Sequence, residues 1–160
     1  MSKIIVGMAD LNVTRAPGIL TTLGLGSCVG IALYDPSTKV AGLAHIMLPD
    51  STKLQNNQNV AKFADTAMAK MLQDMAKMGA NKMRLKAKIA GGAQMFAFNS
   101  KNEDMRIGDR NVEATLKLLK RYAIPLIAYE VGANYGRTVE LYADDGRFLI
   151  KTIGHGNRVL

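Results

Sequence analysis

The sequence predicts an α+β fold, a layered sandwich of mostly antiparallel strands with two main helices. Short β-branched runs bounded by turn residues recur along the chain and are typical of strands. Only two segments carry apolar residues at three- and four-residue steps, the spacing of an amphipathic helix. No repeat, low-complexity tract or linker interrupts the 160 residues. We therefore expect residues 1–160 to form a single domain of packed layers.

The first half of the chain is expected to be rich in strands. Residues 4–8 form an apolar run, and residues 19–23 form a β-branched run after a break at Pro17-Gly18. Two further runs, residues 29–34 and 39–46, flank the sequence Asp-Pro-Ser-Thr. That tetrapeptide suits a type I turn, so the two runs are predicted to pair as an antiparallel hairpin.

The register of this hairpin bears on function. With the turn centred between Pro36 and Ser37, Cys28 lies directly opposite His45. Opposed residues in an antiparallel pair have Cβ atoms roughly 4.5–5.5 Å apart, which permits a thiol–imidazole hydrogen bond. A slip of one residue would place the two side chains on opposite faces.

The longer predicted helix covers residues 60–78, and Gly79 is placed to end it. Its apolar stripe consists of Phe63, Ala64, Ala67, Met68, Met71, Met75 and Met78. Packing of this stripe against a sheet is the preferred interpretation. A methionine-lined groove for a partner is the alternative.

The second half of the chain supplies another helix and four strands. Asp109 is a plausible N-cap for the helix, whose apolar face would consist of Val112, Leu116, Leu119 and Tyr122. The predicted strands cover residues 85–90, 126–131, 138–142 and 147–153, and polar loops are expected at 55–59 and 99–104.

Composition limits the function classes. The net charge of +8 would attract acidic proteins, nucleic acid or an anionic membrane. Without Trp, and with five Tyr and four Phe, the chain has few residues for stacking bases, so no nucleic-acid partner is expected. A single Cys permits no internal disulfide, and no zinc-type cluster is apparent. No apolar run has the ~18 residues of a membrane span, and the N-terminal run is too short for a signal peptide. We expect a cytoplasmic protein without membrane insertion.

Cys28 and His45 are the candidate reactive pair. A catalytic cysteine needs a base and donors for an oxyanion. His45 titrates in a range suited to proton transfer near neutrality. Gly26 and Ser27 precede Cys28, and backbone N–H groups in such a loop can approach a substrate closely. The alternative is that Cys28 is an inert, buried core residue and His45 a hydrogen-bonded core histidine.

A third group could orient the imidazole. The hydroxyl of either Thr21 or Thr22, on the preceding strand, could bond the second ring nitrogen. The other histidine, His155, lies between two glycines, has no identifiable partner and is expected at the surface.

Six ordered motifs across nearly the whole chain closely resemble the CheD family of chemoreceptor glutamine deamidases. They are Thr22-Leu23-Gly24-Leu25-Gly26-Ser27-Cys28, Ala44-His45-Ile46-Met47-Leu48-Pro49-Asp50-Ser51, Phe63-Ala64-Asp65-Thr66-Ala67, Lys88-Ile89-Ala90-Gly91-Gly92-Ala93-Gln94-Met95-Phe96, Ile107-Gly108-Asp109-Arg110-Asn111-Val112 and Gly136-Arg137-Thr138-Val139.

This resemblance implies a fold similar to the catalytic domain of cytotoxic necrotizing factor toxins. It implies that Cys28 is the nucleophile, His45 the base and Thr22 the third member of a Cys–His–Thr site that converts receptor glutamines to glutamates. Thr21 has no match in the family pattern. The implied partners are chemoreceptor cytoplasmic helices and, in many bacteria, a CheC-type phosphatase. No metal or organic cofactor is required.

The expected reaction is acyl transfer to water through a thioester on Cys28, with the oxyanion held by the Gly26–Ser27 loop and the N–H of Cys28. Two alternatives stay open. Such a site could hydrolyse glutamyl methyl esters on the same receptors. The protein could also be a non-catalytic adaptor that binds signalling proteins.

Overall fold

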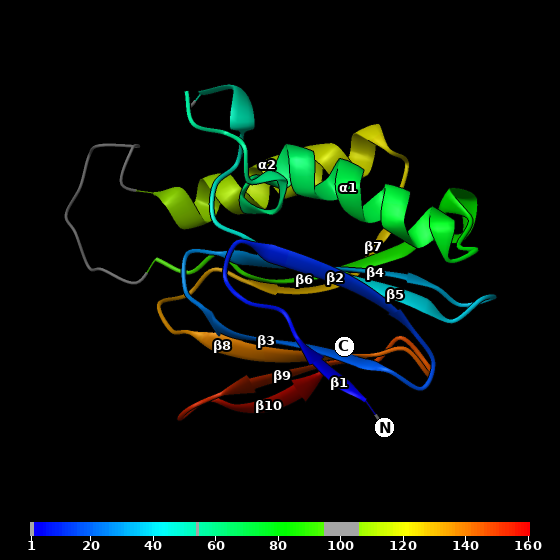
Figure 1. Ribbon diagram of the computed structural model, residues 1–160. Helices are drawn as coiled ribbons and strands as arrows, with labels where there is room; N and C mark the ends of the chain where they lie inside the picture. The colour runs from blue at the N-terminus through cyan, green and yellow to red at the C-terminus, as the bar shows by residue number, and fades with distance from the viewer. Residues whose placement is uncertain (1, 54, 95–105) are drawn as a thin grey trace.

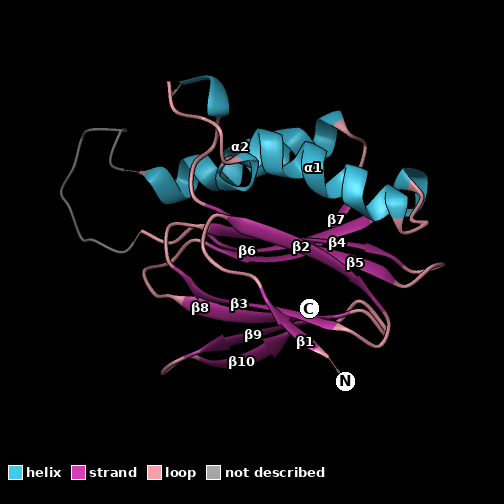
Figure 2. Cartoon of the chain, in the orientation of Figure 1, coloured by secondary structure: helices cyan, strands magenta, loops and turns pink. Residues whose placement is uncertain are grey.

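The molecule is built of three layers in the computed structural model, which describes residues 2–53, 55–94 and 106–160. Helices α1 (Ala64–Lys77) and α2 (Ile107–Arg121) cover one face of a middle sheet (Figure 1). An outer sheet packs on the opposite face (Figure 2). The predicted α+β sandwich with two main helices is therefore confirmed.

Within the described residues, each sheet has five strands. The middle sheet has the order β2-β5-β4-β6-β7, with β2 (Asp10–Arg15), β5 (Val40–Ile46), β4 (Val29–Asp35), β6 (Lys86–Gly91) and β7 (Leu126–Val131). The outer sheet has the order β1-β3-β8-β9-β10, with β1 (Lys3–Ile5), β3 (Ile19–Leu25), β8 (Arg137–Tyr142), β9 (Phe148–Thr152) and β10 (Gly156–Val159). Pairing is antiparallel except for β1 with β3 and β6 with β7.

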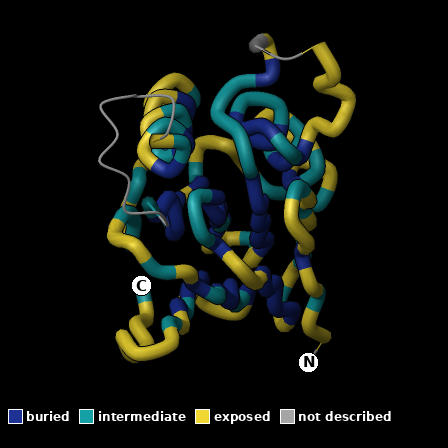
Figure 3. The backbone as a smooth tube through the Cα atoms, turned by 90° about the vertical axis from the view of Figure 1, so that its left-hand side faces the viewer, coloured by how far each residue is buried: buried dark blue, intermediate teal, exposed yellow. Residues whose placement is uncertain are grey.

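The middle sheet is buried on both faces, and the alternation of side chains along a strand divides the core in two. In β4, Ile31 and Leu33 contact the helices, whereas Ala32 contacts the outer sheet. In β5, Ala44 contacts the helices and Leu43 the outer sheet. Figure 3 shows the buried backbone in the interior and exposed backbone at the turns and ends. Burial on both faces explains the nearly continuous apolar runs of these two strands.

The β4–β5 hairpin has a different register from the predicted one. Gly30, not Cys28, is paired with His45. The connection is longer than expected because β4 ends at Asp35, β5 begins at Val40, and Lys39 adopts a left-handed φ of 55° between them. The predicted direct opposition of Cys28 and His45 is therefore wrong. The register differs by two residues, an even number, so the two residues still belong to the same face of the sheet.

Helix α1 begins later than predicted. Residues 60–62 form a separate 3₁₀ turn, η2 (Val60–Lys62), which Asn59 caps by accepting a side-chain hydrogen bond from Ala61 N–H. The methionine stripe of α1 packs on the sheet, as expected: Met68, Met71 and Met75 are fully buried. The helix ends at Lys77, and Gly79 follows with a φ of 98°, which fits the predicted helix stop.

Helix α2 corrects two details of the prediction. It begins at Ile107, so Asp109 lies in its first turn and is not the N-cap. Leu116 is 42% exposed, whereas Asn111 and Thr115 are fully buried. Small and polar side chains line this face because the helix packs closely on backbone: a Cβ on Gly108 would lie 2.5 Å from the carbonyl oxygen of Ala93.

Two strands were not predicted from the sequence. They are β2, an edge strand paired with β5, and β10, an edge strand paired with β9. All four residues of β10 are exposed, so it carries no apolar alternation. The polar loop predicted at residues 99–104 lies outside the described residues.

Candidate active site

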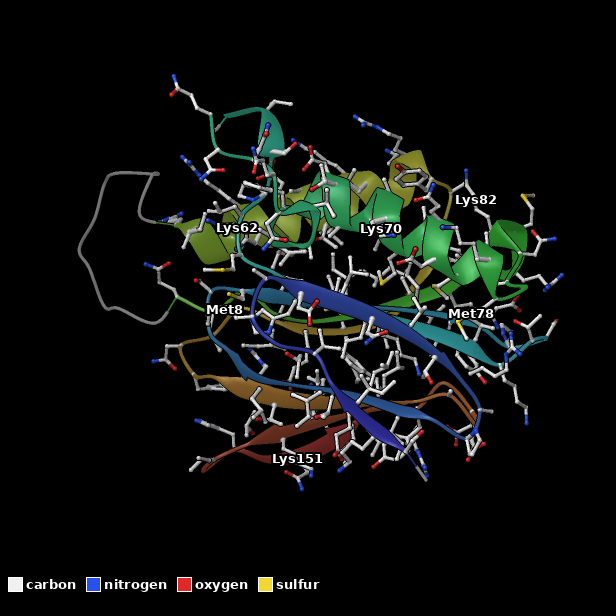
Figure 4. The ribbon with its side chains drawn as sticks, viewed as in Figure 1. Met8, Lys62, Lys70, Met78, Lys82 and Lys151 are labelled. Atoms are coloured by element: carbon white, nitrogen blue, oxygen red, sulfur yellow. The ribbon has the colours of Figure 1, made fainter. Side chains whose placement is uncertain are left out.

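The predicted site residues gather at one end of the two sheets. At this end β3 leads into β4, and β5 and β6 end. Figure 4 labels Met8 and Lys62 at this end and Met78 at the opposite end. Two backbone hydrogen bonds join the incoming loops: Gly92 N–H donates to the Cys28 carbonyl at 2.8 Å, and Ala93 N–H donates to the Gly26 carbonyl at 2.8 Å.

Cys28 immediately precedes β4 and is 7% exposed. It is two residues from Gly30, the ladder partner of His45, and therefore diagonal to the histidine across the pair. Diagonal neighbours on one face are roughly 7–8 Å apart between backbone positions, which long side chains can span. The structure thus brings the thiol and the imidazole to the same face and the same end of the hairpin.

His45 is fully buried and its ring is oriented by Thr22. Oγ1 of Thr22 lies 2.7 Å from Nδ1 of His45 and donates to the carbonyl of Val6 at 2.6 Å. A hydroxyl has one hydrogen and a carbonyl can only accept, so Thr22 must accept the Nδ1–H of His45. Nε2 then carries the lone pair. It is buried and has no hydrogen-bond partner among the described residues.

The neighbouring threonine does not compete for this role. The hydroxyl of Thr21 donates to the carbonyl of Val139 at 2.8 Å, on the adjacent strand of its own sheet. Successive residues of a strand point to opposite faces, so only one of the two threonines can reach the middle sheet. Sequence reasoning from the residues had left Thr21 and Thr22 open, and the geometry favours Thr22.

Burial acts on both members of the reactive pair. Desolvation raises the pKa of the Cys28 thiol, against a smaller opposing effect from its own backbone N–H. Desolvation also lowers the pKa of His45. Both pKa shifts favour the neutral forms, a thiol on Cys28 and an uncharged imidazole on His45. The imidazole is therefore available as a base at neutral pH.

Backbone donors lie beside the sulfur. The N–H of Gly26 donates to the carbonyl of Gly24 at 3.0 Å. The N–H groups of Ser27 and Cys28 find no backbone acceptor within the described part of the chain. Unpaired N–H groups next to a nucleophile are the usual donors to the oxyanion of a tetrahedral intermediate. Of the predicted loop, Ser27 therefore has a donor available, together with Cys28.

Two further residues of this region were missed by sequence reasoning. Val6 contributes only its carbonyl, which no sequence pattern reveals. Asn111 donates from Nδ2 to the carbonyls of Ser27 and Met47, both at 2.9 Å. Its only signal was its place in one of the six motifs.

The other histidine is not part of the site. His155 is exposed, as expected, but it has a partner that the sequence did not indicate: its ring stacks on Tyr135 with centroids 4.0 Å apart. In residues 2–53, 55–94 and 106–160 no group of three or more His, Cys, Asp or Glu side chains is arranged to hold a metal ion. No helix in the same ranges is long and apolar enough to cross a membrane.

Comparison with known proteins shows which family the chain resembles. The family model described as CheD chemotactic sensory transduction matches residues 47–152. A relative from Caldanaerobacter subterraneus subsp. tengcongensis, named probable chemoreceptor glutamine deamidase CheD, is 60% identical over 97% of this chain and 96% of its own. A protein of the same name from Lachnoclostridium phytofermentans is 56% identical over 93% of this chain and 92% of its own.

Similarity to solved structures is weaker. A Neisseria meningitidis protein described under the family model DUF152 aligns with a TM-score of 0.49 and 10% identity, over 84% of this chain and 64% of that protein. Likeness to the cytotoxic necrotizing factor catalytic domain stays a prediction.

Proposed function

The chain belongs to the CheD family, and we propose that it is a chemoreceptor glutamine deamidase with Cys28 as nucleophile, His45 as base and Thr22 as the residue that orients the base. One observation carries the proposal. The Thr22 hydroxyl accepts from Nδ1 of His45, which leaves the lone pair of Nε2 unpartnered, among the described residues, on the face that Cys28 shares. A histidine held in this tautomer can take a proton from a thiol.

The proposed first step is attack on the substrate. Nε2 of His45 takes the proton of Cys28 as the sulfur bonds to the carboxamide carbon of a glutamine side chain. The N–H groups of Cys28 and Ser27 donate to the oxyanion that forms. His45 returns the proton to nitrogen, the C–N bond breaks, and ammonia leaves a thioester on Cys28.

The second step is hydrolysis of the thioester. His45 takes a proton from water, the water oxygen bonds to the thioester carbon, and the C–S bond breaks. The proton goes to the departing sulfur, which restores the thiol and releases a glutamate side chain. All proton transfers use groups that the chain supplies, so the proposal includes no metal or organic cofactor.

The substrate is proposed to be a cytoplasmic helix of a chemoreceptor, which places the enzyme in the cytoplasm. The net charge of +8 favours encounter with an acidic receptor surface and makes the rate of association sensitive to salt. A CheC-type phosphatase is a further proposed partner, and binding of the purified proteins would test it.

The test is incubation of the purified protein with a receptor fragment that contains glutamine. The expected products are free ammonia and the small mass increase that accompanies replacement of NH₂ by OH. Cys28→Ala and His45→Ala should abolish both signals. His155→Ala, which alters the other histidine at an exposed position, is the matched control and should retain activity.

Three results would contradict the proposed deamidase mechanism. Full activity of Cys28→Ala would remove the sulfur from the mechanism. Methanol release from methylated receptor without deamidation would indicate an esterase. Receptor binding without either product would indicate an adaptor.

A further inference from the structure

Asn111 is a fully buried polar residue that the proposed reaction does not use. Its side-chain amide lies 2.9 Å from the carbonyl oxygens of both Ser27 and Met47. Carbonyls only accept hydrogen bonds, so the atom facing them is the NH₂ group. Oδ1 is left buried and without a partner among the described residues. An unsatisfied acceptor costs stability, so the two donated bonds decide the orientation of this amide.

The amide occupies the place where the hairpin ladder ends. The last pair of the β4–β5 ladder is Val29 with Ile46. Ser27 and Met47 lie just beyond that pair, one on the Cys28 side and one on the His45 side. Asn111 therefore bonds to both segments that lead away from the reactive pair, from a helix distant in the sequence.

The bond to Ser27 has a consequence for the next residue. The carbonyl of Ser27 and the N–H of Cys28 belong to one planar peptide unit and point in opposite directions in its trans form. Because Asn111 holds the carbonyl toward α2, the N–H of Cys28 points away from α2. The preceding unit is held in the same way, since Ala93 N–H bonds the carbonyl of Gly26 at 2.8 Å and so orients the N–H of Ser27.

Close packing holds the Asn111 amide within hydrogen-bond distance of the Ser27 carbonyl. A Cβ on Gly108, in the first turn of α2, would lie 2.5 Å from the Ala93 carbonyl oxygen, and a Cβ on Gly92 would collide with the side chain of Val112. The helix thus rests directly on the backbone of the loop beside Cys28. The position of Asn111 relative to Ser27 is therefore set by the close contact of the first turns of α2 with this loop.

We infer that Asn111 is a positioning residue that orients the Ser27–Cys28 peptide so that the N–H of Cys28 donates to the oxyanion. The inference rests on the proposed function for its biological substrate. The amide itself should affect the rate of Cys28 reactions that pass through an oxyanion, and it should not affect the rate of those that do not.

Two reagents separate these cases without any receptor. Cys28 gives its proton to His45 as its sulfur bonds to the acetyl carbon of p-nitrophenyl acetate, which forms an oxyanion, and p-nitrophenolate then leaves with the electron pair of the broken C–O bond. With iodoacetamide the same sulfur displaces iodide from a saturated carbon, and no oxyanion forms. Both rates are measured at one pH and one temperature below unfolding, for the wild type, Asn111→Ala, Asn111→Asp and Thr115→Val. Thr115 is the matched control because it is equally buried one turn along α2 and bonds only the backbone carbonyl of Asn111.

The expected result is a split between the two rates. Both Asn111 variants should slow acylation by about 10- to 100-fold, less than the roughly 10²–10³-fold cost of removing an oxyanion donor because the N–H itself remains, while alkylation stays within about twofold. Thr115→Val should change neither rate by more than about twofold. Asn111→Asp preserves the shape of the side chain and places an oxygen where both carbonyls need a donor.

Other outcomes would overturn the inference. Equal loss of both rates would indicate general disorder of the site, and unchanged acylation would show that the amide does not orient a donor. Unfolding of both Asn111 variants would assign the amide to folding alone. If the Asn111 variants show the split but the wild type releases no ammonia from the receptor, the proposed function fails and the role of Asn111 stands.

Discussion

The hydroxyl of Thr22 lies 2.7 Å from Nδ1 of His45, and this contact joins the outer sheet to the middle sheet at the end that carries Cys28. The same hydroxyl donates to the carbonyl of Val6 at 2.6 Å. One threonine therefore holds the imidazole in place and selects its tautomer.

Thr22→Val should lower kcat for receptor deamidation by about 10- to 100-fold, less than the full contribution of a general base. Valine has the shape of threonine but cannot accept the Nδ1–H, so the proton is free to move to Nε2. Thr22→Ser should recover most of the activity because serine restores the hydroxyl. Steady-state kinetics would show the difference.

Thr21→Val is the control for this prediction, since Thr21 bonds Val139 on the other face of the strand. It should leave kcat within about threefold of the wild type. Equal loss in Thr21→Val and Thr22→Val would show that the effect comes from weakening β3 and not from freeing the imidazole.

The pH dependence of the reaction should show a plateau across neutrality. Burial lowers the pKa of His45, so the base becomes protonated only below its ordinary value of about 6.5. Burial raises the pKa of the Cys28 thiol above its ordinary value of about 8.5. The acid limb of kcat/KM should therefore have its midpoint below 6.5. Thiolate absorbance, with Cys28→Ala as the blank, should increase only in the alkaline range, and a thiolate already present at pH 6 would contradict this.

Asp35 should contribute stability that is lost in acid. Burial alone would raise its pKa, but hydrogen bonds from Arg84, Asn81 N–H and Ser37 N–H outweigh burial and hold the pKa well below its usual range. A carboxylate with a lowered pKa stabilises the fold above its unfolded pKa, about 3.9, and the contribution disappears as the pH falls below that value.

Asp35→Asn should therefore lower the free energy of unfolding at pH 7 by about 3 kcal/mol, because the amide cannot accept all of these donors and leaves Arg84 without its charge partner. The difference from the wild type should shrink as the pH falls toward 2. Urea unfolding at several pH values is the measurement. Glu113→Gln, at the exposed ion pair with Lys117, is the control and should cost less than about 0.5 kcal/mol.

Gly42→Ala should destabilise the protein although it adds only a methyl group. A Cβ at this position of β5 would lie 2.9 Å from Cγ of Met71 and 2.9 Å from Sδ of Met75. Such overpacking costs about 1–3 kcal/mol. Gly7→Ala is the control, since no described atom beyond its chain neighbours lies within 4 Å of the place its methyl group would take, and the φ of Gly7 is not left-handed. A thermal scan in which both variants melt with the wild type would contradict the close contact of α1 with β5.

Much of the fold followed from local patterns. The apolar runs predicted β4 and β5, and the methionine stripe predicted a helix that packs on a sheet, because burial on one face repeats with the period of the element. The edge strands β2 and β10 were harder to predict from the sequence. In β2 only Leu11 and Val13 alternate with polar residues, and β10 is exposed throughout, so neither run has a buried face to mark it.

The hairpin register could not be predicted from the local sequence. The Asp-Pro-Ser-Thr sequence suits a short turn, yet β5 begins only at Val40. The longer connection is stabilised from outside the hairpin: the Asp35 carboxylate accepts hydrogen bonds from Arg84 and from Asn81 N–H, both in the segment after α1. A turn held by residues so far along the chain could not be chosen from its own four residues.

The sequence by itself determined the candidate residues for the chemistry and the two hairpin strands beside Cys28 and around His45, since apolar runs are read directly along the chain. That Cys28 and His45 share a face depended on the register, which the folded hairpin set. The family resemblance pointed to Thr22, but only the tertiary structure shows that Thr22 and not Thr21 reaches the imidazole, and that Asn111 reaches the Ser27 carbonyl. Those choices depend on how the two sheets and α2 stack. A hydrogen bond requires its partners to lie within about 3 Å, and no periodicity in the chain records which distant residues the packed layers bring that close.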